Sequence, residues 1–355
     1  MLVHVHGFLP YFYVPAPPGF QNAHKQSFLS QLDAGVRSHF GKQRLENSSA
    51  GSVVDIHLVH KASIFGFQGN KKTLFLKIFL RTQSDMATAK RTLREGIDVV
   101  GLGRIHVETP FESNIPYPLR FMIDTKIPGF SWVELPPKSY TIREPKDSLS
   151  NCQLEVDIMF NNIISHQPDG EWSQIAPLRI LSFDIECAGR KGVFPDAQQD
   201  PVIQIANVVT VQGSSKPFIR NVFTLNTCAN IVGSQVLCHG TESELLMSWS
   251  EFVREVDPDV IIGYNINGFD FPYLLDRAEA LKLQDFAFLG RLSASKTNAK
   301  DSRFSSKAYG TRDTKNINIE GRLQLDMLQI MQRDYKLRSY SLNSVCSHFL
   351  GTSIL

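Results

Sequence analysis

Residues 180–192, ILSFDIECAGRKG, combine the apolar alternation of a buried β-strand with two acidic side chains. In a strand successive side chains point to opposite faces, so Asp184 and Glu186 stand on one face and Phe183 and Ile185 on the other. Neighbouring carboxylates repel each other and raise their own pKa values, a cost that a shared cation or proton offsets. Oxygen ligands of this kind suit Mg²⁺ or Mn²⁺. The alternative is a strand end where both acids face solvent, and this pattern alone leaves both interpretations open.

Composition limits the classes of protein to consider. The chain has 355 residues, 42% of them hydrophobic and 20% charged, which is enough for two domains with cores of their own. Its 37 Lys and Arg nearly balance its 35 Asp and Glu, so a nucleic-acid surface would have to be a local patch. Five scattered cysteines without C-x-x-C spacing predict reduced thiols and argue against a zinc or iron–sulfur site. With no secretory or membrane-spanning pattern, we expect a soluble, non-secreted protein with no membrane partner.

The order of strand, loop and helix patterns predicts two domains. Residues 1–165 alternate these patterns as an α+β unit does, and the polar stretch 166–177 marks the start of a second domain, 166–355. Apolar residues at helical spacing from Phe28 to Phe40 predict a helix, and Asp85 is expected to cap another that runs to Ile97. His4 and His6 share a strand face. Without a further ligand in view, we interpret them as a structural pair.

A third carboxylate follows a second predicted strand. In GYNINGFD, residues 263–270, a turn leads into a helix that begins near Asp270. Asp270 can serve as the N-cap of that helix. However, strand-to-helix loops of α/β sheets are where ligands are held, so Asp270 can also join Asp184 and Glu186 in one acidic site.

Both acidic segments resemble a known family. FDIE, and N-x-x-x-F-D from Asn265 to Asp270, resemble the first two exonuclease motifs of the family B DNA polymerases. Longer strings, among them HGFLPYFYVPAPPGF at residues 6–20, extend the resemblance over essentially the whole chain. It implies an α/β, RNase H-like 3′→5′ exonuclease domain with a mixed sheet and flanking helices. An α+β family B N-terminal domain would precede it.

The resemblance also implies a chemistry. In this family two divalent ions, Mg²⁺ or Mn²⁺, support hydrolysis of the terminal phosphodiester at the primer 3′ end. Asp184 would bridge the ions, Glu186 would bind the ion that activates water, and Asp270 would complete the site. Asn265 and Phe269 would shape the pocket around the 3′ nucleotide. The implied partners are single-stranded DNA and, for a full-length polymerase, accessory subunits and a sliding clamp, in the nucleus.

The sequence departs from the family pattern after LRSYSLNSVCSHFLG, residues 337–351. The third exonuclease motif, Y-x-x-x-D, is expected downstream of this string and is not in the sequence. We therefore expect an exonuclease domain incomplete at its C-terminal side, an N-terminal domain incomplete at its start, and no polymerase domain. This predicts a fragment of a polymerase subunit, inactive by itself, whose parent is a DNA-directed DNA polymerase with 3′→5′ exonuclease activity; the alternative is a truncated, non-catalytic form that binds DNA or replication partners.

Residues 293–315 are a candidate DNA-binding segment with a local net charge of +4, six basic side chains against two acidic ones. Basic and aromatic side chains together can grip phosphates and stack on unpaired bases, whereas the alternative is a solvated loop. The resemblance implies a β-hairpin that helps to separate the primer strand. Asp326 is expected to cap the next helix. The basic residues are Lys296, Lys300, Arg303, Lys307, Arg312 and Lys315.

Overall fold

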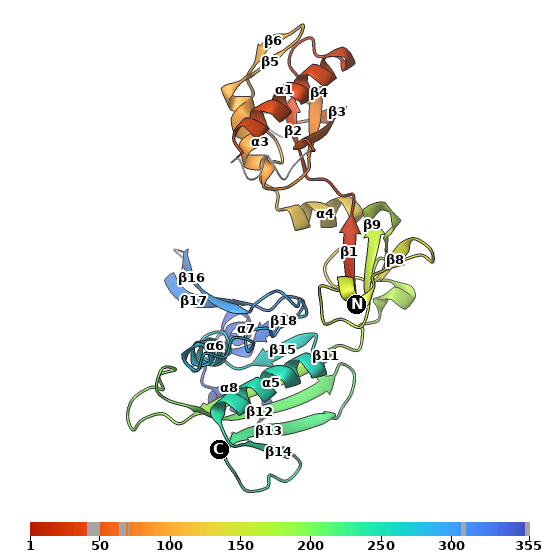
Figure 1. The fold of residues 1–355 in the computed structure, drawn as a ribbon. Helices are drawn as coiled ribbons and strands as arrows, with labels where there is room; N and C mark the ends of the chain where they lie inside the picture. Colours follow the sequence, from red (N-terminus) through yellow and green to blue (C-terminus); the bar gives the residue numbers. More distant parts are fainter. Residues whose placement is uncertain (41–49, 64–68, 70, 307–309, 352–355) are drawn as a thin grey trace. The chain divides into compact units, whose positions relative to one another are not determined.

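The computed structural model describes residues 1–40, 50–63, 69, 71–306 and 310–351. The chain forms two compact units (Figure 1). One comprises Val3–Thr141 and Val156–Ser173, and the other comprises Met1–Leu2, Ile142–Glu155 and Gln174–Leu355. The domain boundary between residues 165 and 166 stays a prediction. None of the helices in the described ranges is long and apolar enough to cross a membrane.

The first unit is built around a three-stranded antiparallel sheet in the order β2-β4-β3. Its strands are β2 (Tyr11–Pro15), β3 (Val53–Ala62) and β4 (Lys72–Leu80), and the helices α1 (Lys25–Ser38) and α3 (Asp85–Glu95) share a core with it. The helix predicted between Phe28 and Phe40 is confirmed, since Phe28, Leu32 and Val36 are fully buried on its inner face.

The prediction for the second helix of this unit was wrong at both ends. Ser84, not Asp85, occupies the cap position of α3, and Asp85 lies in its first turn. The helix ends at Glu95 because Gly96 takes a φ of 95°, which leaves the helical region. Ile97 then begins strand β5 (Ile97–Val99).

Short elements account for most of the remaining residues of the first unit, and three of them, β1, β8 and β9, extend one residue beyond its bounds. β5 pairs with β6, β7 pairs with β10, and β1, β9 and β8 form a small sheet. In that sheet the His6 ring lies 2.5 Å from a carboxylate oxygen of Asp157, which agrees with a structural role for His6. The elements are β1 (Leu2–His6), β6 (Gly103–Ile105), α4 (Tyr117–Thr125), β7 (Val133–Glu134), β8 (Tyr140–Ile142), β9 (Glu155–Met159) and β10 (Ile164–Ser165).

The second unit is organised by a six-stranded mixed sheet in the order β14-β13-β12-β11-β15-β18 (Figure 1). The central strand β11 pairs antiparallel with β12 and parallel with β15, and β18 continues parallel beyond β15. The α/β fold with a mixed sheet and flanking helices is therefore confirmed. The strands are β11 (Arg179–Cys187), β12 (Val202–Val211), β13 (Ile219–Leu225), β14 (Gln235–His239), β15 (Val260–Gly263) and β18 (Leu323–Asp326).

Helices α5 (Glu242–Val256) and α6 (Asp270–Ala280) cover the face of the sheet that carries Phe183 and Ile185. Trp249 of α5 is fully buried there, and its indole N–H donates to Asn207 Oδ1 at 2.9 Å. Helices α7 (Met327–Asp334) and α8 (Leu342–Leu350) and the strands β16 (Asn298–Ser306) and β17 (Gly310–Asn318) complete the unit. This packing leaves Asp184 and Glu186 on the face away from α5.

A buried ion pair joins α5 to α6. Arg277 Nε and Nη2 donate to the two carboxylate oxygens of Glu242 at 2.9 and 2.7 Å, and both side chains are only 10% exposed. Glu242 also accepts from the Val202 backbone N–H at the start of β12. One carboxylate therefore connects both helices to the sheet.

We expect Arg277→Met to lower the free energy of unfolding of this unit by about 3 kcal/mol, because it leaves the buried Glu242 charge without its partner. Urea unfolding followed by tryptophan fluorescence measures the loss. Arg333→Met is the matched control, since Arg333 pairs with Asp334 on the solvent side of α7 and its loss should change nothing measurable. Equal effects of the two substitutions would contradict the prediction.

Candidate active site

Asp184 and Glu186 lie near the carboxyl end of β11, where both are exposed. Asp184 stands opposite Ala206 and Glu186 opposite Gln204 on β12. The register shifts between Glu186 and Cys187, so the regular ladder ends directly after the second acid. The sequence pattern correctly placed both acids on the same face of the strand.

Asp270 is the first residue of α6 and is 1% exposed. The cap position belongs to Phe269, whose side chain makes no capping hydrogen bond. Instead of capping its own helix, Asp270 accepts a hydrogen bond through Oδ1 from the Ile185 backbone N–H at 3.2 Å. Asp270 is therefore joined to β11 between the two acids of the strand, and its alternative role as an N-cap was wrong.

Burial, and after it the neighbouring Asp184 carboxylate, raise the pKa of Asp270 to about 7. Backbone N–H groups oppose the shift only in part. Two carboxyl groups in this arrangement hold a proton between them or bind a cation. By donor type the pair fits a hard divalent ion such as Mg²⁺.

Glu186 does not join Asp184 and Asp270 in one group of possible metal ligands. Within the described ranges, no three or more His, Cys, Asp or Glu side chains come together closely enough to hold a metal ion. The structure thus brings together Asp184 and Asp270, as the sequence predicted, and leaves the third predicted ligand apart from them.

The loop between β15 and α6 carries the two predicted pocket residues. Asn265 adopts a left-handed φ of 65°, which turns the chain directly after the strand. The Phe269 ring packs edge-on against Phe194, with ring centres 5.3 Å apart, and against Tyr273 at the same separation. These aromatic residues border a cavity of about 440 Å³ that reaches Asp276 on α6.

The sequence analysis did not identify Phe194. In the structure this residue is 74% exposed, and its ring contacts the motif residue Phe269. The available signal was an aromatic residue in VFPD, residues 193–196, only eight positions after Glu186.

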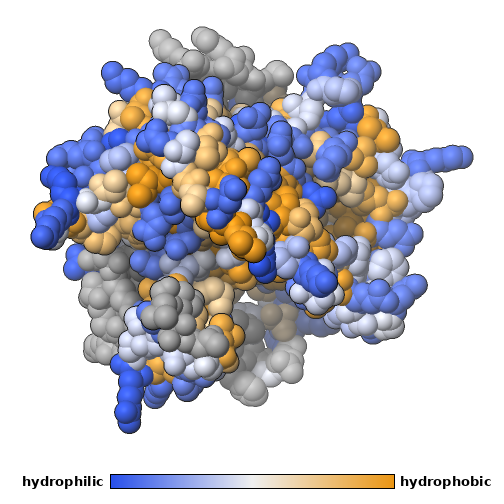
Figure 2. Space-filling view, turned by 90° about the horizontal axis from the view of Figure 1, so that it is seen from below, coloured by the Kyte–Doolittle hydropathy of each residue, from blue (hydrophilic) through white to orange (hydrophobic). Residues whose placement is uncertain are grey.

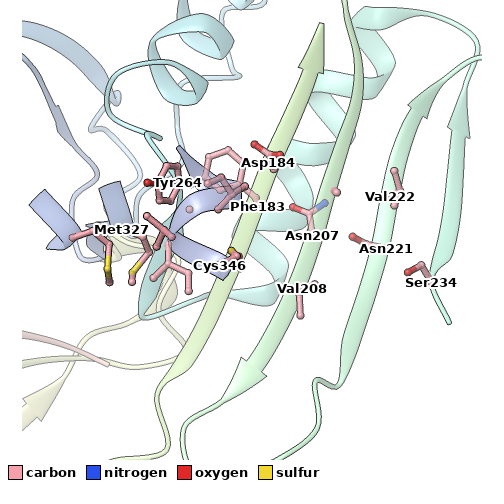
Figure 3. Close-up of a pocket in the computed structure, with 17 residues that line it drawn as sticks. Phe183, Asp184, Asn207, Val208, Asn221, Val222, Ser234, Tyr264, Met327 and Cys346 are labelled. Atoms are coloured by element: carbon pink, nitrogen blue, oxygen red, sulfur yellow. The ribbon is translucent and has the colours of Figure 1, made fainter. Parts of the chain in front are cut away.

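A second cavity, of about 430 Å³, opens beside Asp184 (Figure 3). The strands β11, β12 and β13 form one wall with Asp184, Val208 and Val222, while Met327 and Cys346 come from α7 and α8. Apolar atoms dominate this lining. Figure 2 shows that apolar side chains also gather in an irregular band on the face of the molecule that it presents. Asp184 therefore borders a mainly apolar recess between the sheet and the helices α7 and α8.

The hairpin predicted in the basic segment is confirmed, because β16 and β17 pair antiparallel over their full length. Ala299 and the buried Ile317 stand opposite each other and pack toward the core that includes α6. Lys315 belongs to the same face by alternation, and its ammonium lies 3.8 Å from Asp276 of α6. Lys300 is exposed on the opposite face.

Among the basic residues whose side chains the structure describes, Lys300 and Lys315 therefore lie on opposite faces of the hairpin. Lys296 lies before the hairpin, with its ammonium 5.2 Å from the ring centre of Phe288. Arg303 is exposed on β16. Lys307 lies outside the described residues, as does the side chain of Arg312.

Residues 108–345 match the family model of the DNA polymerase family B exonuclease domain. The chain belongs to the family B DNA polymerases. Residues 7–87 match a second family model, the DNA polymerase delta catalytic subunit-like N-terminal domain. The resemblance to the family B DNA polymerases is thereby confirmed, with one match in residues 7–87 and the other in residues 108–345.

Relatives of this family B chain are DNA polymerase delta catalytic subunits. That of Schizosaccharomyces pombe is 51% identical over 99% of this chain, and that of Bos taurus is 47% identical over 98%. The chain spans 31% of the length of each. Among solved structures, the family B DNA polymerase of the archaeon Pyrobaculum calidifontis matches with a TM-score of 0.61 and 23% identity, over 98% of this chain and 35% of its own. At that identity the likeness shows the fold alone.

We expect Asp270 to make stability depend on pH. Its folded pKa of about 7 lies above the ordinary value of 3.8, so the folded state holds a proton that the unfolded state releases between these values. The contribution of Asp270 to the free energy of unfolding is therefore fully present below about pH 4 and is lost as the pH rises through 7. In the absence of divalent ions, Asp270→Asn should melt at a higher temperature than the parent at pH 8 and lose this advantage at pH 4. A constant difference between the two proteins across this range would contradict the assignment.

Proposed function

We propose that this chain carries the 3′→5′ proofreading exonuclease region of a replicative DNA polymerase, of the delta catalytic subunit type. The observation that supports the proposal most directly is the buried Asp270 docked beside Asp184 on the central strand, in a chain of family B. An acid pair of this kind suits phosphodiester hydrolysis, in which negative charge builds on the phosphate and must be balanced.

Each residue has a role in this proposal. Asp184 and Asp270 would hold Mg²⁺ or Mn²⁺, and Glu186 would join them from the next position on the same face. Two bound ions would activate a water molecule and neutralise charge on the phosphate. Asn265 and Phe269 would orient the 3′ nucleotide. The apolar residues around Asp184 would exclude bulk water, which strengthens the electrostatic interactions there.

The full activity of the relatives is part of the same proposal. The curated relatives are catalytic subunits about three times as long as this chain. We infer that the parent protein carries out DNA-directed DNA synthesis with proofreading, in the nucleus. Accessory subunits and a sliding clamp would be its partners there. The primer 3′ end, as single-stranded DNA, would be the substrate of this region.

A second candidate function is DNA binding without cleavage. It is favoured by the separation of Glu186 from the Asp184–Asp270 pair, since no described group of three ligands is assembled. The chain would then occupy primer ends or replication partners without hydrolysing DNA.

Cleavage of a 3′-labelled single-stranded oligonucleotide by the purified chain, in Mg²⁺ or Mn²⁺, distinguishes the two candidates. Release of the terminal nucleotide would support hydrolysis by this chain, and it should fall to background in Asp184→Ala plus Glu186→Ala because the ligands for the cation are removed. Circular dichroism of both proteins verifies the fold. Binding of the oligonucleotide without cleavage by the folded parent would reject hydrolysis and support the second candidate.

The hairpin gives a separate prediction. Lys300→Ala should reduce the salt dependence of oligonucleotide binding by about 0.7 in the slope of log K against log salt, because one phosphate contact is lost. Lys315→Ala is the matched control, since Lys315 already pairs with Asp276 and should leave the slope unchanged. Fluorescence anisotropy titrations at several salt concentrations measure both. An unchanged slope for Lys300→Ala would remove this residue from the proposed DNA contact.

A further inference from the structure

The carboxylate of Asp326 binds three backbone N–H groups from two different elements. Asp326 is the last residue of β18 and is 4% exposed. Its Oδ1 accepts from the N–H of Leu328 at 3.0 Å, which is the expected cap of α7. The same oxygen accepts from Asn265 at 2.9 Å, and Oδ2 accepts from Asn267 at 3.0 Å. The sequence predicted the cap but not the two bonds to the loop.

These two bonds hold the loop that contains the N-x-x-x-F-D motif. The loop begins after Gly263, which stands opposite Asp326 in the parallel pairing of β15 and β18. Asn265 lies in the left-handed region, which non-glycine residues adopt rarely and asparagine adopts more readily than most. Charge-assisted bonds from a carboxylate to backbone N–H groups are among the stronger hydrogen bonds in proteins. The hydrogen bonds to Asp326 therefore stabilise the left-handed conformation of Asn265, the first residue of the motif.

The fixed turn determines where the motif acid begins its helix. The Asn265 carbonyl accepts from the N–H groups of Gly268 and Phe269, and the Phe269 carbonyl accepts from Tyr273 in the first turn of α6. Asp270 follows directly and binds the Ile185 backbone N–H of β11. A continuous set of hydrogen bonds thus leads from Asp326 through the loop to the acid pair.

We propose that Asp326 is a positioning residue for the candidate active site, acting through the 265–269 loop to hold Asp270 against β11. Its role in the reaction rests on the proposed exonuclease function. Asp326 does not bind the cation or the substrate in this proposal. Its hydrogen bonds to the loop fix where α6 begins, and therefore where Asp270 lies relative to Asp184.

The decisive variant is Asp326→Ser, because serine is a good N-cap and can keep the bond to Leu328, while its single oxygen cannot serve both loop N–H groups. Residue-resolved hydrogen exchange follows the Ile185 N–H, which reports whether Asp270 stays docked. The dissociation constant of Mn²⁺ from the same protein reports whether Asp184 and Asp270 can still bind a cation together. We expect faster exchange at Ile185, and an Mn²⁺ dissociation constant raised about tenfold or more, as is typical when residues that orient a ligand are lost.

Ser341→Ala is the matched control, because it removes the cap of α8, where Ser341 Oγ accepts from the Ser344 N–H at 3.3 Å, and leaves the loop intact. Its Ile185 exchange and Mn²⁺ affinity should equal those of the parent, even though its melting temperature falls. Parental exchange at Ile185 in Asp326→Ser would overturn the positioning role. Failure of the parent itself to bind Mn²⁺ would reject the metal-dependent function, while the exchange at Ile185 would still decide whether Asp326 positions Asp270.

Discussion

The buried Asp270 carboxyl group, held beside Asp184 by the Ile185 N–H, is the interaction around which the candidate site is arranged. A carboxylate that is 1% exposed and faces another acid is costly in its charged form, as the raised pKa of Asp270 shows. Such a cost is retained only where the surrounding structure holds the group in place. Here the Ile185 N–H binds it from the sheet, and its position at the start of α6 fixes it from the helix.

The mixed sheet brings the necessary parts to one edge. Because β11, β15 and β18 run parallel, their carboxyl ends meet on the same side of the sheet. The first strand delivers Asp184, the second leads into the motif loop, and the third ends at Asp326, which binds that loop. At the opposite ends of β15 and β18, Arg322 donates to Asp257 at 2.7 Å, so charged interactions fix both ends of these strands.

Charged and apolar side chains occupy different places in this unit. The β16–β17 hairpin presents Lys300 away from α6, while Lys315 is used to attach the hairpin to that helix. The recess beside Asp184 is lined mainly by apolar side chains from the sheet, α7 and α8. An exposed basic side chain on the hairpin and a mainly apolar recess beside Asp184 therefore lie in the same unit as the acid pair.

Features that depend on neighbours along the chain could be predicted from the residue pattern. Alternation placed Asp184 and Glu186 on one face of a strand, helical spacing from Phe28 gave α1, and Asp326 was recognised as a cap. Which acids meet depends on the packing of distant segments, because Asp270 reaches β11 across 85 positions of sequence. The separation of Glu186 and the two further bonds of Asp326 likewise follow from packing between elements. Local pattern fixes the direction of a side chain, whereas burial and charge pairing depend on what the fold brings against it.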